Sequence, residues 1–147
     1  MPCFSGLVSS NQILFNCTVG AVGSSGNPAD RKPYIALLDT GAQGTAFSQK
    51  VVDDLSLVAV GWIDMTGVSG TVNVPLYEVD VGIAVQESAM DSSGNLVALS
   101  GFERAFPSTK ASLADFGNNA KFDVLVGMDI INACYVTVHN GTYTICI

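Results

Sequence analysis

The sequence predicts an all-β protein with one or two short helices. Apolar and polar residues alternate over several stretches, most regularly in residues 72–81, and this period is typical of half-buried strands. Clusters of Gly, Asn, Asp and Ser, as in residues 23–28 and 91–95, separate these stretches and favour turns. Because expected strands greatly outnumber expected helices, we predict a fold built on β-sheets.

The individual elements follow from the same patterns. Strands are expected at residues 12–22, 34–38, 58–65, 72–81, 96–106 and 122–126. Residues 48–55 predict a short helix with Ser48 as its N-cap, and residues 127–132 predict another. Residues 107–119 are expected to be irregular, and residues 135–147 to form a hairpin that turns at Asn140-Gly141.

The composition limits the kind of protein. The chain has 147 residues, which suits one domain spanning residues 1–147. A net charge of −7 with only six Lys and Arg argues against a nucleic-acid partner. No apolar run approaches the roughly 18 residues of a membrane span, and residues 1–10 lack the regions of a signal peptide. Hydrophobic residues reach 48% against 13% charged, which favours additional apolar area buried between subunits.

The four cysteines are Cys3, Cys17, Cys134 and Cys146. Their spacing matches no metal site, and we expect neither a metal nor another cofactor. In the expected terminal hairpin, the sulfurs of Cys134 and Cys146 would point to opposite faces of the ribbon, which disfavours a disulfide between them. We therefore expect free thiols in a reducing compartment, the cytoplasm.

Residues 34–47 contain the strongest candidate for chemistry. An apolar strand ends at Asp39, and the chain cannot comfortably continue as a strand through Asp39-Thr40-Gly41-Ala42. A carboxylate therefore stands at the end of a buried strand, where it is costly unless it is paired or hydrogen-bonded. Asp39 is a candidate catalytic acid, although an isolated Asp-Thr-Gly also marks ordinary turns.

Two further segments follow the Asp39 segment along the chain. Residues 66–71, Thr66-Gly67-Val68-Ser69-Gly70-Thr71, are a glycine-flanked turn within a long expected hairpin. Residues 124–131 join an apolar strand to a short helix through Gly127. Together with the Asp39 segment they resemble the retropepsin-like aspartic proteases, in particular the cellular homodimeric members. In that family the three segments are the catalytic loop, the flap, and the C-terminal strand with its helix, and the likeness covers about residues 12–146.

The resemblance implies a closed, barrel-like β-domain that acts as a homodimeric aspartic endopeptidase on extended polypeptides. Aspartic proteolysis needs two carboxylates that share one proton, and the chain has no second Asp-Thr-Gly or Asp-Ser-Gly. Two copies would each contribute Asp39, and a sheet of terminal strands, including residues 142–147, would join them.

The resemblance also implies roles for single residues. The catalytic loop would be Asp39, Thr40 and Gly41, with Thr40 bonded to the partner loop and Gly41 binding the substrate backbone. Ala42 would line the substrate pocket. The flap would add substrate contacts from Thr66, Gly67, Val68, Ser69 and Gly70.

Two positions depart from the viral members of the family. Gln43 and Met128 stand where viral members have Asp and Arg, which form an ion pair there. The absence of both is consistent with a different way of packing this region. Asp123 and Asp129 are expected to cap or turn the chain near Gly127.

Other functions remain open at this point. The domain could be catalytically inactive and serve for dimerisation or peptide binding, because a fold does not dictate an activity. It could also be a monomeric structural β-domain with Asp39 as a turn residue. The flap could instead be a plain glycine-bearing hairpin. Trp62 is expected to be a core or hairpin anchor rather than a substrate contact.

Overall fold

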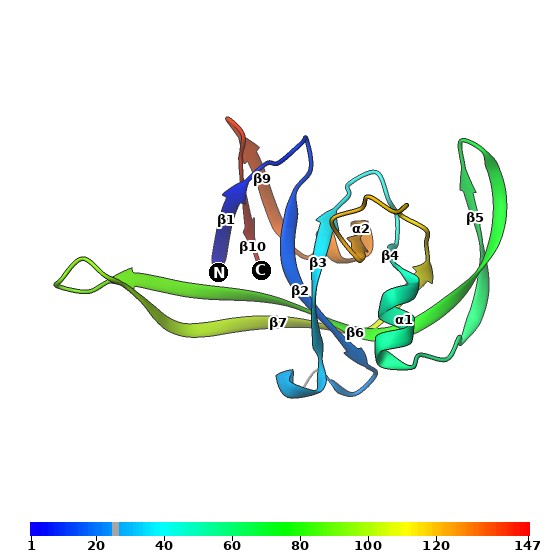
Figure 1. Cartoon of the computed structure of the whole chain (residues 1–147), viewed down its shortest axis with the longest axis horizontal. Helices are drawn as coiled ribbons and strands as arrows, with labels where there is room; N and C mark the ends of the chain where they lie inside the picture. Colours follow the sequence, from blue (N-terminus) through cyan, green and yellow to red (C-terminus); the bar gives the residue numbers. More distant parts are fainter. Residues whose placement is uncertain (25–26) are drawn as a thin grey trace.

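Strands dominate the computed structural model of the protein (Figure 1), as the sequence predicts. The structure describes residues 1–24 and 27–147, without the side chains of residues 28, 86–89, 96–100 and 102, so part of the expected loop at residues 23–28 lies outside the described residues. The elements are β1 (Cys3–Leu7), β2 (Leu14–Ala21), the 3₁₀ helix η2 (Pro28–Asp30), β3 (Lys32–Leu38), β4 (Thr45–Phe47), α1 (Gln49–Leu55), β5 (Gly61–Gly67), β6 (Gly70–Met90), β7 (Leu96–Leu113), β8 (Val124–Val126), α2 (Met128–Ile131), β9 (Tyr135–His139) and β10 (Thr142–Cys146).

A closed barrel forms the body of the molecule. Its strands follow the order β2-β3-β8-β4-β7-β6, and β2 also pairs with β6, which closes the ring. β3 runs parallel to β8, and β4 runs parallel to β7, whereas β4 and β8 are antiparallel. Apolar side chains fill the interior, and Phe47, Val79, Ile83 and Val124 are fully buried there. The closed barrel and its two short α-helices confirm the predicted all-β class.

β6 and β7 form one long antiparallel hairpin that crosses the barrel and projects beyond it, to the left in Figure 1. Its turn lies at residues 91–95, as predicted, where the carboxylate of Asp91 accepts hydrogen bonds from two backbone N–H groups. At the other end of β6, Pro75 pairs with β5 but lies just before the stretch that pairs with β7. Residues 70–75 of β6 thus pair with β5 alone, and the missing N–H of Pro75 is tolerated on the open side.

The prediction that residues 107–119 are irregular is wrong for residues 107–113, because β7 continues to Leu113. A bulge allows this. Pro107 and Ser108 lie together opposite the buried Asp80, and the Asp80 carboxylate accepts a hydrogen bond of 2.9 Å from the backbone N–H of Ser108. A bulge accommodates proline, which has no N–H to donate to the ladder.

A second, three-stranded sheet joins the two ends of the chain in the order β1-β10-β9. β9 and β10 form the predicted hairpin, and the turn residues Asn140 and Gly141 both have positive φ (48° and 73°). Strand β1 was not among the expected elements. It is short, and its five residues bear no charge and little alternation, so that only its pairing with β10 reveals it.

The pairing of β1 with β10 corrects the prediction of four free thiols. Cys3 lies directly opposite Cys146, and the two form a disulfide, whereas Cys17 and Cys134 are free. Cys134 and Cys146 do not pair, as expected, because Cys146 stands opposite Tyr135. Disulfides persist in oxidising compartments, so the reasoning that led to a cytoplasmic location does not hold for this pair. In the described part of the chain, no helix has the length and apolar character needed to cross a bilayer.

The same sheet shows how the terminal strands pair within one chain, and the sheet shared by two chains stays a prediction. β10 is hydrogen-bonded to β1 on one edge and to β9 on the other, so residues 142–146 have no free edge for a second chain. The free edges of this sheet belong to β1 and β9.

Candidate active site

Asp39 lies where the sequence predicts it, on a tight loop at the end of β3. Its backbone N–H donates to the carbonyl of Val126 in β8 at 3.0 Å, so the last contact of the strand pair fixes the position of the acid. One carboxylate oxygen, Oδ1, accepts a hydrogen bond of 2.8 Å from the N–H of Gly41. Asp39 is partly buried and Thr40 and Gly41 are exposed, so the loop presents the carboxylate at the surface of the barrel.

Helix α2 supports the second half of this loop. The N–H groups of Met128 and Asp129, in the first turn of α2, donate to the carbonyls of Ala42 and Gln43 at 2.9 and 3.1 Å. In return, the Asp129 carboxylate accepts hydrogen bonds from the N–H and the hydroxyl of Thr45, at 3.0 and 2.9 Å. Helix α2 therefore both donates hydrogen bonds to the loop and accepts hydrogen bonds from the residue that follows it, Thr45.

Asp129 has a more specific role than the predicted turn residue, since it anchors the start of β4. Asp123 accepts a hydrogen bond from the Ser48 hydroxyl at 2.9 Å, and Ser48 occupies the N-cap position of α1 without capping the helix through its side chain. Sequence reasoning missed the contact between Asp129 and Thr45 because it joins residues 84 positions apart. The sequence offered one indication of this contact, namely that Asp129 lies in the first turn of a predicted helix.

Gly127 allows α2 to approach the loop closely. A Cβ atom at this position would lie 2.5 Å from the backbone oxygen of Gly44 and 3.1 Å from that of Ala42. Its φ of −94° suits any residue, so the requirement is for space rather than for conformation. The glycine of the third predicted segment thus lets α2 pack closely against residues 42–44 of the loop that follows Asp39.

The hairpin of β5 and β6 contains the predicted flap residues. Thr66 pairs with Thr71, and Gly67 with Gly70, so that Val68 and Ser69 form the turn. Gly70 has a φ of +120°, which favours glycine. In Figure 1 this hairpin curls upward at the right, on the same side of the barrel as the loop between β3 and β4.

The structure therefore places the predicted site residues on two elements. Asp39 to Ala42 form one loop, and residues 66–70 form the tip of a separate hairpin. Among the residues that the structure describes, 1–24 and 27–147, no hydrogen bond or salt bridge joins the two elements. Trp62 is not a core residue, because 66% of its surface is exposed, but it lies within the hairpin opposite Pro75, where a hairpin anchor is expected.

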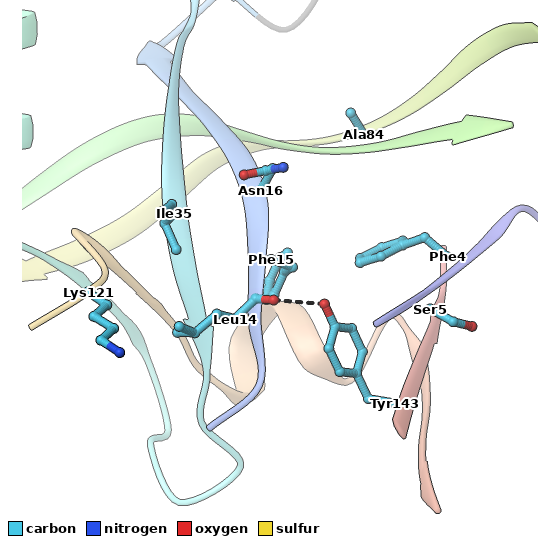
Figure 2. A pocket seen from close by; sticks show the side chains of 9 residues that line it. All are labelled: Phe4, Ser5, Leu14, Phe15, Asn16, Ile35, Ala84, Lys121 and Tyr143. Atoms are coloured by element: carbon cyan, nitrogen blue, oxygen red, sulfur yellow. Dashed lines mark hydrogen bonds between the residues drawn. The ribbon is translucent and has the colours of Figure 1, made fainter. Parts of the chain in front are cut away.

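A pocket of about 540 Å³ lies elsewhere, between the terminal sheet and strands β2 and β3 (Figure 2). The rings of Phe4, Phe15 and Tyr143 line it, and the Tyr143 hydroxyl donates to the carbonyl of Leu14 at 2.7 Å. Its lining contains Lys121 but no carboxylate. This pocket lacks the acids that peptide hydrolysis by carboxylates requires.

Comparison with known proteins supports the fold. No protein-family model and no curated protein matches the chain. Among solved structures, the chain is similar to a retropepsin-like aspartic protease from Rickettsia conorii, with a TM-score of 0.56 and 11% identity. The match covers 97% of this chain and 89% of the other. The chain therefore has a retropepsin-like fold.

Proposed function

We propose that the protein is an aspartic endopeptidase whose two-carboxylate site assembles from Asp39 of two identical chains. The observation that carries the proposal is the position of Asp39. It ends the strand that pairs with β8, on an Asp-Thr-Gly loop braced by α2, in a barrel with the fold of an aspartic protease. An acid held in this way at the surface of the barrel is available to a second copy of itself.

The chemistry follows from two carboxylates that share one proton. The charged carboxylate takes a proton from water, and the resulting hydroxide attacks the carbonyl carbon of the peptide bond. The protonated carboxylate donates its proton to the carbonyl oxygen, which gives a neutral tetrahedral intermediate. The carboxyl group that took the proton from water then gives it to the amide nitrogen, the other carboxylate takes a proton from a hydroxyl of the intermediate, and the carbon–nitrogen bond breaks. A single chain supplies one such acid, and therefore half of the site.

The second copy would be held through surfaces that the fold leaves open. The free edges of β1 and β9 are candidates, because an uncharged edge strand can pair with a strand of another chain. Large apolar side chains are exposed on these strands, with Leu7 at 77% and Tyr135 at 61%. In such a dimer the terminal sheets of the two chains would join through β1 or β9, and β10 would keep its pairing with both strands of its own chain.

Replacement of Asp39 by Asn tests the function. We expect wild-type protein to cleave unfolded casein and Asp39→Asn to be inactive, with unchanged circular dichroism and sedimentation. Asp115→Asn is the matched control, because Asp115 accepts a hydrogen bond of 2.9 Å from the N–H of Gly117 in the same local geometry. Hydrolysis by the Asp39→Asn protein would contradict the catalytic role of Asp39.

Mixed dimers test the shared site. Wild-type and Asp39→Asn chains are mixed after unfolding and refolding together. If each site needs Asp39 from both chains, an equal mixture keeps about one quarter of the wild-type activity, whereas a site within one chain keeps about one half. A protein that binds casein peptides but never cleaves them would instead be the inactive binding module considered above.

A further inference from the structure

Trp62 is the only tryptophan of the chain, and two thirds of its surface is exposed. It lies on β5, near the base of the hairpin that carries the predicted flap. An exposed indole ring of this size leaves much apolar surface in water, and tryptophan is enriched where proteins bind ligands. The exposed ring is therefore a candidate contact for a ligand.

The strand register shows which side chains share a face with Trp62. Trp62 is paired with Pro75 and Asp64 with Asn73, and side chains of directly paired residues lie on the same side of a ribbon. Asn73 donates a hydrogen bond of 2.7 Å to Asp64 Oδ1. Residues two apart on a strand also share a face, so Trp62 and Asp64 are neighbours, roughly 7 Å apart along β5.

This face is the one that β6 turns toward the barrel. Tyr77 is two residues beyond Pro75, and the register remains regular between them. The Tyr77 ring is buried against the ring of Phe47, with centroids 5.6 Å apart. Phe47 belongs to β4, the strand that follows the Asp39 loop. Trp62 and Asp64 therefore lie on the same face of the hairpin as Tyr77. This face packs on Phe47, next to the loop that carries Asp39.

The Asp64 carboxylate lacks a cation of its own. In the described part of the chain, salt bridges join Arg31 to Glu103, Lys50 to Asp54 and Lys110 to Glu78, and none involves Asp64. The side chain of Asp64 is exposed, so it is available to a ligand.

We propose that Trp62 and Asp64 form a subsite for a lysine or arginine side chain of the bound peptide. A basic group beside the indole face gains a cation–π interaction, and the neighbouring carboxylate adds a charge-assisted hydrogen bond. The net charge of −7 also favours the approach of a basic peptide. The inference rests on the proposed function, because that function requires a peptide to bind under the hairpin. It adds to that function a preferred class of substrate, basic peptides.

A purely structural role for Asp64 makes a different prediction. If its carboxylate serves only to hold Asn73 across the hairpin, its charge is irrelevant to peptides. Asp64→Asn separates the two roles, because the amide oxygen can still accept the hydrogen bond from Asn73 while the charge is lost. Asp91→Asn is the matched control. It removes one charge from the turn of the β6–β7 hairpin, at the end of the molecule opposite the β5–β6 hairpin (Figure 1).

Binding is measured in the Asp39→Asn background, so that the result does not depend on cleavage. Fluorescein-labelled peptides that differ only in a central Lys, Gln or Glu are titrated by anisotropy, and Trp62 fluorescence is recorded with unlabelled peptides. We expect the Lys peptide to bind most tightly and to change Trp62 fluorescence. Asp64→Asn should weaken Lys binding about three- to fivefold, leave Gln binding unchanged and reduce the salt dependence. Asp91→Asn should change none of these.

Equal affinity for the three peptides, or equal loss of affinity in Asp64→Asn and Asp91→Asn, would overturn the subsite. These measurements distinguish failure of the subsite from failure of the peptidase proposal. Selective Lys binding by a protein that never cleaves peptides would support the subsite and refute the peptidase, whereas cleavage without preference for basic residues would do the reverse.

Discussion

Replacement of Gly127, which lies between β8 and α2, by Ala should disturb the loop that follows Asp39. The new Cβ would meet the backbone oxygen and carbon of Gly44 at 2.5 and 2.6 Å. These atoms belong to the main chain, so the contact is relieved only if the loop or α2 moves. Overpacking of this kind costs about 1–3 kcal/mol. The movement also weakens the hydrogen bond from Met128 to Ala42, and a net hydrogen bond is worth about 0.5–1.5 kcal/mol.

We therefore expect Gly127→Ala to lower the free energy of unfolding by about 2–4 kcal/mol, and the Tm by about 5–15 °C. Urea unfolding and calorimetry measure both. Gly44→Ala is the matched control in the same loop, because its Cβ would meet nothing within 4 Å and we expect a change below about 0.5 kcal/mol. Equal losses in the two variants, or none in either, would refute the close approach of α2 to the loop.

Two more predictions concern the cysteines. The disulfide closes a loop with a sequence separation of 143 residues. Replacement of both Cys3 and Cys146 by Ser should lower the free energy of unfolding by about 2–5 kcal/mol, measured by urea unfolding against the oxidised wild type. Burial raises the pKa of the Cys17 thiol from its ordinary value of 9.0 to about 12. The native state then keeps a proton that the unfolded state releases, so stability should fall as the pH rises from 9 toward 12, by up to about 1.4 kcal/mol per pH unit. Cys17→Ala should show a shallower fall over this range, and parallel curves for the two proteins would contradict the assignment.

The parts of the fold that sequence reasoning found are those fixed by short segments. The Asp39 loop follows from an apolar strand that runs into Asp-Thr-Gly, and the β9–β10 turn follows from Asn140-Gly141, because only such residues adopt positive φ easily. The turn at residues 91–95 was predictable for a similar reason. Each of these depends on a few consecutive residues.

The parts that it missed depend on residues far apart in the chain. The disulfide requires the register that sets Cys3 opposite Cys146, and β1 has too little pattern of its own to indicate that register. The support of Thr45 by Asp129 likewise joins two distant segments. The exposure of Trp62 was not predictable because hydrophobicity alone does not reveal that β5 extends beyond the closed ring of the barrel.

The bond between Cys3 and Cys146 makes the covalent chain a ring that includes almost every residue. The two ends meet on one sheet, where the N–H of Ile147 donates to the carbonyl of Pro2 at 3.0 Å (Figure 1). A protease that nicks the projecting turn at residues 91–95 would open this ring without dividing the molecule, and the two fragments would separate only after reduction. The same adjacency suits circular permutation, with the old ends linked and new ends placed in that turn.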